Sequence, residues 1–371
     1  MMKIVYIATS IIPSRTANSI HVMKMCQAFA QNGHEVFLLV PDRYKECELG
    51  IVDVFSFYGV ERCFEIVYIP LLPIKGKNLV FGFQAAQNAK QFKPDLVYGR
   101  DLAGCFFISL MKYQTIFESH APVGNFIYVR MIKKLIKSST LKKFVVITYA
   151  LKNYYIEQYP FLEDKIFVAP DGADSIPNTI LPVTFPNKGK KLQVGYVGHL
   201  YPGRGIEVIE QLAKRCPWAD FHIIGGTDDD INSCMQLIKP SNNLIFQGYK
   251  PSFEAEKYRL GCDILLAPYQ NKVSVAGGGN TVKWMSPLKV FEYMASGKAI
   301  ICSDIPVLKE VLDHGRNAIL CDPEDIDSWE NALLYLYENE TERIRIGDNA
   351  KSDLISNYTW YSRVQKILDK I

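Results

Sequence analysis

Short apolar runs rich in Val, Ile and Phe alternate with segments of helical periodicity along the chain. Apolar strands of this kind are typical of a parallel sheet that helices cover on both faces. One of the intervening helical stripes is Ser19–Gln31, which Gly33 ends. The alternation predicts a doubly wound α/β domain. Its expected strands are Lys3–Ala8, Glu35–Val40, Glu65–Ile69, Asp95–Tyr98, Thr115–Glu118 and Phe144–Thr148.

A second series of the same kind follows residues 176–191, where three prolines and weak periodicity predict a linker. We expect a first domain over residues 1–180, a linker over 181–191, a second domain over 192–355 and an amphipathic helix over 356–371. The second series has expected strands at Gln193–Val197, Asp220–Ile224, Asn243–Phe246, Asp263–Ala267 and Ala299–Cys302, and expected helices at Ile206–Lys214 and Ser252–Leu260.

Composition narrows the class of protein. The chain has 371 residues, 48% of them hydrophobic, which suits two domains of ordinary size. A net charge of +3 is too small to indicate nucleic-acid binding. Nine cysteines without a CxxC pair favour reduced thiols in the cytosol over a disulfide framework or a zinc site. No apolar stretch approaches the roughly 20 residues that span a bilayer.

One segment of the second series combines a helix start with a carboxylate one turn further on. The helix is predicted to begin near Pro287, because a proline N–H would have no partner in the first turn. The free N–H groups from Ser286 to Leu288, at the positive end of the helix dipole, form a seat for a phosphate. Lys289 adds a positive charge, and the Glu292 carboxylate can accept two ribose hydroxyls. This combination indicates a nucleotide-sugar site.

Five segments across nearly the whole chain resemble the GT-B glycosyltransferases, specifically the large retaining family four. They are Ala17–Val36, Phe117–His120, Val168–Asp174, Gly195–Gly205 and Ser286–Val311. The resemblance implies two Rossmann-like domains facing a cleft, with the C-terminal helix crossing back to the first. It also implies retaining transfer of a hexose-type sugar from a nucleoside-diphosphate-sugar to a hydroxyl acceptor. The expected pathway is assembly of a bacterial-type surface polysaccharide or glycolipid.

The resemblance assigns donor binding mainly to the second domain. The glycine loop that opens at Gly198 lets backbone N–H groups approach a diphosphate, and Arg204 supplies a fork of donors. The nucleobase would lie near Gly248 and the ribose on Glu292. His199 stands where the family usually has a basic residue, which bears on the strength of diphosphate binding. A strand–helix turn with a surface arginine is the alternative interpretation of this loop.

The resemblance places further groups in the first domain. His120 ends a strand at the carboxyl edge of the sheet, where open α/β folds bind ligands. With Arg204 and Glu292 it is a catalytic candidate, as a neutral imidazole that donates to the sugar or the departing phosphate. A histidine satisfied within a turn is the alternative. Asn18 belongs to a small-residue loop that can approach the sugar. Trp284 replaces the family's first glutamate, so its usual sugar contact is missing or replaced.

No metal and no other cofactor is expected. Asp228–Asp230 contains a DxD pattern, but it precedes a helical segment, where acidic residues suit the N-terminus. The glycine run at Ala276–Asn280 lacks the strand-then-helix context of a dinucleotide motif, and we predict a flexible loop.

Residues 126–143 predict a basic amphipathic helix with Arg130, Lys133, Lys134 and Lys137 opposite an apolar face. Such a helix can lie on an anionic membrane or simply cover the sheet, and both interpretations stay open. The expected partners are a nucleotide-sugar donor and a saccharide or lipid-linked saccharide acceptor, without nucleic acid. The expected location is cytoplasmic, with peripheral contact at the inner face of the cell membrane as an open alternative.

Two other functions fit the same architecture. One is a sugar-nucleotide epimerase or phosphorylase, and the other is a nucleotide-sugar-binding partner subunit without catalysis. Trp284 and His199 are the residues that keep the second alternative open.

Overall fold

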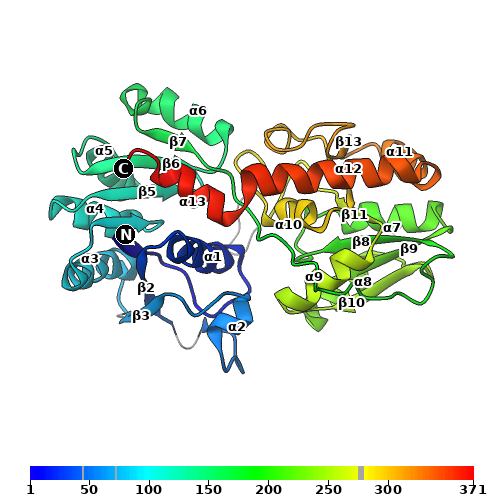
Figure 1. Cartoon of the computed structure of the whole chain (residues 1–371), viewed down its shortest axis with the longest axis horizontal. Helices are drawn as coiled ribbons and strands as arrows, with labels where there is room; N and C mark the ends of the chain where they lie inside the picture. The colour runs from blue at the N-terminus through cyan, green and yellow to red at the C-terminus, as the bar shows by residue number, and fades with distance from the viewer. Residues whose placement is uncertain (44–45, 72, 275–279) are drawn as a thin grey trace. The chain divides into compact units, whose positions relative to one another are not determined.

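The computed structural model of the chain describes residues 1–43, 46–71, 73–274 and 280–371. Most of the glycine run at 276–280, predicted to be a loop, lies outside these residues. The chain divides into two compact units (Figure 1). Unit 1 comprises Met1–Asp171 and Trp360–Ile371, and unit 2 comprises Gly172–Thr359.

Unit 1 is built on a parallel sheet with the strand order β3-β2-β1-β4-β5-β6-β7 among its described residues. Its strands are β1 (Lys3–Ile7), β2 (Glu35–Asp42), β3 (Glu65–Pro70), β4 (Leu96–Gly99), β5 (Thr115–Ser119), β6 (Leu141–Val146) and β7 (Ile166–Val168). Its helices are α1 (Ala17–Gln31), α2 (Val54–Tyr58), α3 (Lys77–Ala89), η2 (Lys90–Phe92), α4 (Leu102–Leu110), α5 (Phe126–Ile136), α6 (Tyr149–Gln158), η3 (Pro160–Leu162) and α13 (Trp360–Leu368). The order of the strands reverses between β1 and β4, which makes that point the topological switch of the sheet.

Unit 2 repeats this plan with the parallel order β10-β9-β8-β11-β12-β13, and its switch point lies between β8 and β11. Its strands are β8 (Leu192–Val197), β9 (Ala219–Ile224), β10 (Leu244–Gly248), β11 (Ile264–Ala267), β12 (Ala299–Ser303) and β13 (Ile319–Cys321). Its helices are α7 (Ile206–Arg215), α8 (Asp228–Leu237), α9 (Ser252–Gly261), α10 (Leu288–Ser296), α11 (Ile326–Glu338), α12 (Glu340–Asp353) and the π-helical turn η4 (Leu354–Tyr358). The predicted architecture of two doubly wound parallel sheets is confirmed.

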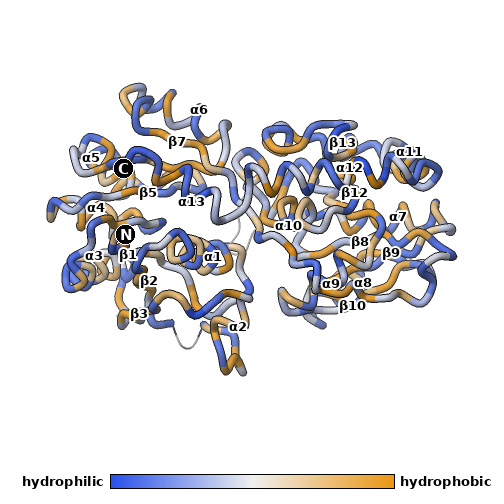
Figure 2. The backbone as a smooth tube through the Cα atoms, viewed as in Figure 1, coloured by the Kyte–Doolittle hydropathy of each residue, from blue (hydrophilic) through white to orange (hydrophobic). Residues whose placement is uncertain are grey.

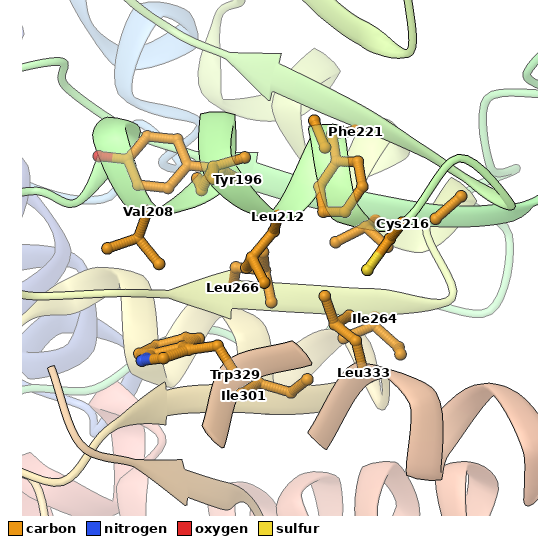
Figure 3. Packing of buried hydrophobic residues seen from close by; sticks show 14 of the residues in the cluster. Tyr196, Val208, Leu212, Cys216, Phe221, Ile264, Leu266, Ile301, Trp329 and Leu333 are labelled. Atoms are coloured by element: carbon orange, nitrogen blue, oxygen red, sulfur yellow. The ribbon is translucent and has the colours of Figure 1, made fainter. Parts of the chain in front are cut away.

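The hydrophobic core of unit 2 shows why the apolar runs form buried strands. Side chains from β9 and β11 meet those of α7 and α11, including Phe221, Leu266, Leu212 and Trp329 (Figure 3). Trp329 is fully buried, and its indole N–H donates to the carbonyl oxygen of Asp322 at 2.8 Å. Figure 2 shows the same pattern along the backbone, where orange hydrophobic stretches mark the central strands.

The last helix belongs to unit 1, as predicted. α13 packs against α1 and buries Trp360, Arg363, Val364 and Ile367 (Figure 1). The amphipathic pattern over the final residues therefore corresponds to a buried face of α13. Arg363 lies on this face, which is unexpected for a charged residue.

The boundary between the units falls at Asp171, earlier than the predicted residue 180, and the predicted linker packs within unit 2. The backbone N–H of Ala173 donates to the Tyr358 carbonyl at 3.1 Å. Further along, the ring of Phe185 is buried and stacks on His222, with 3.8 Å between ring centroids. Prolines weakened the periodicity of this segment but did not prevent it from packing.

Two short strands were not predicted, β7 and β13. Each has three residues, and each lies at an edge of its sheet. A run of three residues is too short to show a clear apolar period.

Candidate functional site

Two glycines allow a tight approach between the loop after β8 and helix α10. Gly198 has φ 148°, and a Cβ there would lie 2.7 Å from Cε of Lys289. Gly225 has φ 132°, and a Cβ there would collide with the carbonyl oxygen of Gly198. Glycine is required at both positions by the backbone conformation and by the space available. The loop therefore presses its backbone against the Lys289 side chain.

Helix α10 is held over the switch point of unit 2 by a buried tyrosine. The Tyr293 hydroxyl accepts the backbone N–H of Val197 at 2.8 Å and lies 3.3 Å from the carbonyl oxygen of Leu266. These two residues belong to β8 and β11. The helix begins at Leu288 after Pro287, close to the predicted start, and no side chain caps it. Its first turn therefore keeps free N–H groups beside the strand ends.

Lys289 is buried in this turn, and no described carboxylate forms an ion pair with it. Its Nζ lies 3.4 Å from the ring centroid of Tyr196 and has no hydrogen-bond partner among the described residues. Burial, and then the positive charge of Arg204, hold the pKa of Lys289 well below its usual value. A cation in this position gains cation–π attraction from the neighbouring rings and some attraction from Glu292, but it has no ion pair among the described residues, so an added anion would stabilise it.

Arg204 shares an aromatic neighbour with Lys289. Its guanidinium carbon lies 5.3 Å from the ring centroid of Tyr269, and Lys289 Nζ lies 5.5 Å from the same centroid. Arg204 Nη2 makes only a long 3.5 Å contact to the Ser274 carbonyl, and its buried Nε has no partner within the described ranges. We call Arg204 and Lys289 the cation pair. A buried lysine and a half-buried arginine at the end of a glycine loop make this place a candidate anion site.

Glu292 lies one turn after Lys289, and the structure gives it a partner that the sequence analysis missed. Its Oε2 lies 3.2 Å from Nη1 of Arg259, a residue of α9 whose side chain is only 6% exposed. The side chain of Glu292 is 28% exposed. Glu292 is thus neither a freely solvated carboxylate nor one wholly available to a ribose. No local pattern could have paired two residues 33 positions apart.

The other predicted donor residues surround this loop or the adjacent strand end. The His199 ring stacks on Tyr201 with centroids 4.9 Å apart, and its carbonyl accepts the Tyr196 hydroxyl at 2.5 Å. Gly248 ends β10 with φ 70°, and its carbonyl accepts the N–H of Gly225. Ser286 precedes the uncapped turn of α10.

In unit 1, His120 belongs to a group of ionisable side chains that contact one another, which we call the buried network. Its members are His21, Glu118, His120, Asp171 and Arg363. Glu118 lies at the centre, with Oε1 at 2.8 Å from Arg363 Nη2, 2.6 Å from His120 Nε2 and 3.1 Å from His21 Nε2. His21 Nδ1 lies 2.9 Å from Asp171. Burial by itself would raise the pKa of the Glu118 carboxyl. The interactions with Arg363 and then with His21 outweigh burial and hold this pKa well below its usual range.

The network is close to neutral when His21 is an imidazolium. Both ring nitrogens of His21 face a carboxylate oxygen, one of Asp171 and one of Glu118. An imidazolium has N–H donors on both nitrogens, so two carboxylates then balance two cations, His21 and Arg363. His120 is the member that stays neutral, because burial, and next the charge of Arg100, lower its pKa to about 4.

Four of these side chains could in geometry hold a metal ion. Ligand atoms of His21, Glu118, His120 and Asp171 lie within 4.8 Å of one another. However, the carboxylate of Glu118 is already occupied by Arg363, and His21 directs its two nitrogens to different carboxylates. A dication would have to displace these bonds beside a guanidinium. The set fits a hydrogen-bonded network better than a metal site.

The remaining sequence predictions have definite places. Asn18 lies exposed in the first turn of α1 and accepts the Ser10 hydroxyl at 3.0 Å, with no described contact to His120. Asp228–Asp230 begin α8, where Thr227 and Asp230 form a capping box, so their assignment to a helix start is confirmed. Trp284 lies in a turn before α10.

The apolar stripe of the basic helix is used inside unit 1. In α5, Met131, Ile132, Leu135 and Ile136 are buried, and the helix contacts α4 and β6. The exposed large hydrophobic residues of α5 are Phe126 and Ile127 near its start, and its basic residues Arg130, Lys133 and Lys134 are exposed as well. No helix in the described part of the chain is long and apolar enough to cross a membrane.

Comparison with known proteins agrees with this geometry. Residues 19–175 match the family described as Glycosyltransferase Family 4, and residues 180–353 match the family Glycosyl transferases group 1. An uncharacterised glycosyltransferase of Methanocaldococcus jannaschii is 24% identical over 90% of this chain and 88% of its own length. One of Haemophilus influenzae is 26% identical over 60% of this chain, and the match spans only 59% of that protein.

Solved structures give the fold. The crystal structure of Anabaena HepE in complex with UDP-glucose covers 99% of this chain and 98% of its own, with a TM-score of 0.71 and 14% identity. The two doubly wound units of this chain have the fold of the GT-B glycosyltransferases. The chain belongs to the glycosyltransferases of the family-four type, whose two matched segments together take in most of its length.

Proposed function

We propose that this glycosyltransferase moves a hexose-type sugar from a nucleoside-diphosphate-sugar to a hydroxyl acceptor with retention of configuration. The observation that carries the proposal is the cation pair, which lies at the switch point of unit 2 and has no ion-pair partner among the residues that the structure describes. A donor diphosphate is the anion whose size and charge suit two cations and an uncapped helix turn. The expected setting is assembly of a surface polysaccharide or glycolipid.

We assign the nucleobase, the ribose and the diphosphate of the donor to unit 2. The nucleobase lies near Gly248, and the diphosphate lies on Arg204, Lys289 and the N–H groups after Ser286. Glu292 accepts ribose hydroxyls through the oxygen that Arg259 does not hold. Support from a neighbour is direct, since structures of HepE contain UDP and UDP-glucose.

Charge stabilisation by these groups acts on the leaving diphosphate. As the bond between C1 and the β-phosphate oxygen breaks, negative charge grows on that oxygen, and preorganised cations favour it. In the proposed front-face route the acceptor oxygen bonds to C1 on the same face. The acceptor proton passes to the departing phosphate oxygen, so no side-chain nucleophile is required. The reaction is proposed to be metal-independent because Arg204 and Lys289 supply the positive charge.

His120 contributes from unit 1 as a neutral ring. Its Nε2 lies 2.6 Å from a Glu118 carboxylate that Arg363 keeps ionised, so the proton is assigned to Nε2. Nδ1 is then an acceptor, and we assign it to a substrate hydroxyl. This reverses the donor role that the sequence suggested. Asn18 adds a polar group at the start of α1.

The proposed acceptor is a saccharide or lipid-linked saccharide. Because the apolar stripe of α5 is buried, a peripheral membrane contact through residues 126–143 would use the basic face of the helix and the exposed side chains near Phe126. Through this contact the protein would bind peripherally to the inner face of the cell membrane.

The test is calorimetric titration of UDP, GDP and ADP into the parent protein and Arg204→Ala. The variant loses a charge-assisted fork, which should weaken binding of the preferred nucleotide by about 2–3 kcal/mol. Arg215→Ala is the matched control, because Arg215 is an exposed arginine of unit 2 that pairs with Asp327 and Glu330. Equal affinity of Arg204→Ala and the parent would refute the donor site. NMR of the product formed from the turned-over sugar nucleotide tests retention.

A further inference from the structure

A cavity of about 380 Å³ lies in unit 1 at the carboxyl ends of its central strands. Thr9 follows β1, Arg100 follows β4 and His120 follows β5, and all three line the cavity. The reversal of strand order between β1 and β4 lies directly beneath it. Open α/β sheets bind ligands in the crevice at such a point. Its volume is at the low end for small-molecule sites and suits a single sugar unit.

The cavity contains a cation that the protein does not neutralise. Nη1 of Arg100 is buried and has no hydrogen-bond partner, and no ion pair joins Arg100 to a carboxylate in the part of the chain that the structure describes. Its backbone is fixed, since its N–H donates to the Ile7 carbonyl at 3.0 Å. Arg100 as a whole is half-buried and lines the cavity, so its guanidinium is available to an oxyanion.

The two carboxyl groups that also line the cavity are engaged elsewhere. Asp101 caps α4, with Oδ1 at 2.6 Å from the N–H of Gly104, and burial raises the pKa of its carboxyl to about 7. Glu118 is held by Arg363 in the buried network. The neutral His120 adds no charge. Arg100 therefore leaves the cavity with an unbalanced positive group.

The rest of the wall suits hydroxyl groups. The side-chain Oδ1 of Asn125 caps α5 by accepting the backbone N–H of Ile127 at 2.9 Å, which leaves the side-chain NH₂ of Asn125 as a donor. Asn78 and Tyr128 also line the cavity. Amide, hydroxyl and imidazole groups around one guanidinium match a polyhydroxylated ligand that carries one negative group.

We infer that this cavity binds the acceptor, and that the acceptor is a saccharide bearing an oxyanion, either a phosphate or a carboxylate, which Arg100 recognises. The inference rests on the proposed function, because it assigns the sugar-accepting substrate to unit 1. The Arg100 guanidinium binds the oxyanion, and His120 Nδ1 accepts a hydroxyl of the same sugar.

The experiment titrates glucose and galactose, each as the neutral sugar, the 6-phosphate and the uronate, into the parent protein, with inorganic phosphate as a further arm. At least one phosphate or uronate should bind about tenfold or more tightly than its neutral sugar. The oxyanion is identified by which of the two forms, the 6-phosphate or the uronate, binds more tightly. Arg100→Gln should remove the preference, and its melting temperature should not fall, because the substitution removes an unpaired cation. Arg62→Gln, an exposed arginine of the same unit, should keep the preference.

Several outcomes would overturn the inference. These are equal affinity for neutral and anionic forms, binding of none of the anionic sugars, retention of the preference in Arg100→Gln, or binding of inorganic phosphate as tight as that of the sugar phosphate. Parallel titration of UDP separates the two proposals. If UDP binds and the anionic preference is absent, the donor assignment stands and this inference fails. If the Arg100-dependent preference is present without UDP binding, the proposed function fails.

Discussion

The buried network of unit 1 and the cation pair of unit 2 both place positive groups near the carboxyl ends of parallel strands. In unit 1, Arg363 finds Glu118 at 2.8 Å, and His21 lies between Glu118 and Asp171. In unit 2, Lys289 and Arg204 have no carboxylate partner within the described residues, and Glu292 pairs instead with Arg259. The charges of the first arrangement satisfy one another, whereas those of the second have no counter-charge among the described residues.

This difference indicates which charges serve structure and which serve binding. A buried pair whose partners satisfy each other is costly to break from either side. A buried cation without a partner destabilises the apo protein, and its deletion removes that cost. Buried charge is therefore informative about function mainly where its partner is absent.

The largest expected effect is on stability and separates the two units. Glu118→Gln leaves Arg363 buried without a full counter-charge and should lower the free energy of unfolding by about 3–5 kcal/mol. Lys289→Met, which keeps the length of the side chain but removes the charge, should leave stability unchanged or raise it. Chemical denaturation of the two variants and the parent measures both changes. Equal losses in the two variants would contradict the comparison.

A smaller effect is expected from pH. The pKa of His120 is lowered to about 4 by burial and by the charge of Arg100, whereas an unfolded histidine titrates near 6.5. Between these values the unfolded chain binds the extra proton, so stability should fall as the pH is lowered from about 6.5 to 4. His120→Gln should remove on the order of 2 kcal/mol of this dependence.

The measurement is the difference between parent and His120→Gln across the pH range. The difference is needed because other groups titrate in the same window. His222 of unit 2 also has a pKa lowered to about 4 by burial, and Asp101 has one raised to about 7. His222→Gln serves as the matched variant in unit 2. If His120→Gln leaves the pH dependence of the free energy of unfolding unchanged, then protonation of this ring does not contribute to that dependence.

The smallest expected effect concerns metals. Treatment with EDTA, or addition of Zn²⁺ or Mn²⁺, should leave the melting temperature and the transfer rate unchanged. The four ligand atoms around Glu118 are already occupied by Arg363 and by one another, and Asp228–Asp230 begin a helix. Loss of activity on chelation that Mn²⁺ restores would assign the acidic residues to a metal instead.

Local features of the fold were predictable from the sequence. The strands at Lys3–Ala8 and Asp220–Ile224, the helix start at Pro287 and the helix at Asp228 were each found within a residue or two. These features depend on residues a few positions apart: the hydrophobic period, the helix caps, and the prolines and glycines that end helices or form turns. They can therefore be predicted directly from the sequence. The glycine loop and the α10 segment, also recognised in the sequence, carry the two members of the cation pair.

Partners at long sequence separation were decided only by the tertiary structure. Arg363 meets Glu118 across 245 positions, and Arg259 meets Glu292 across 33. The availability of Arg100 likewise depends on carboxylates that the fold directs elsewhere. The sequence alone determined which segments form strands, helices and glycine turns. Which charges are paired and which are not depends on strand order and helix packing, because hydrogen bonds and close ion pairs require distances of a few ångströms in space, whatever the distance along the chain.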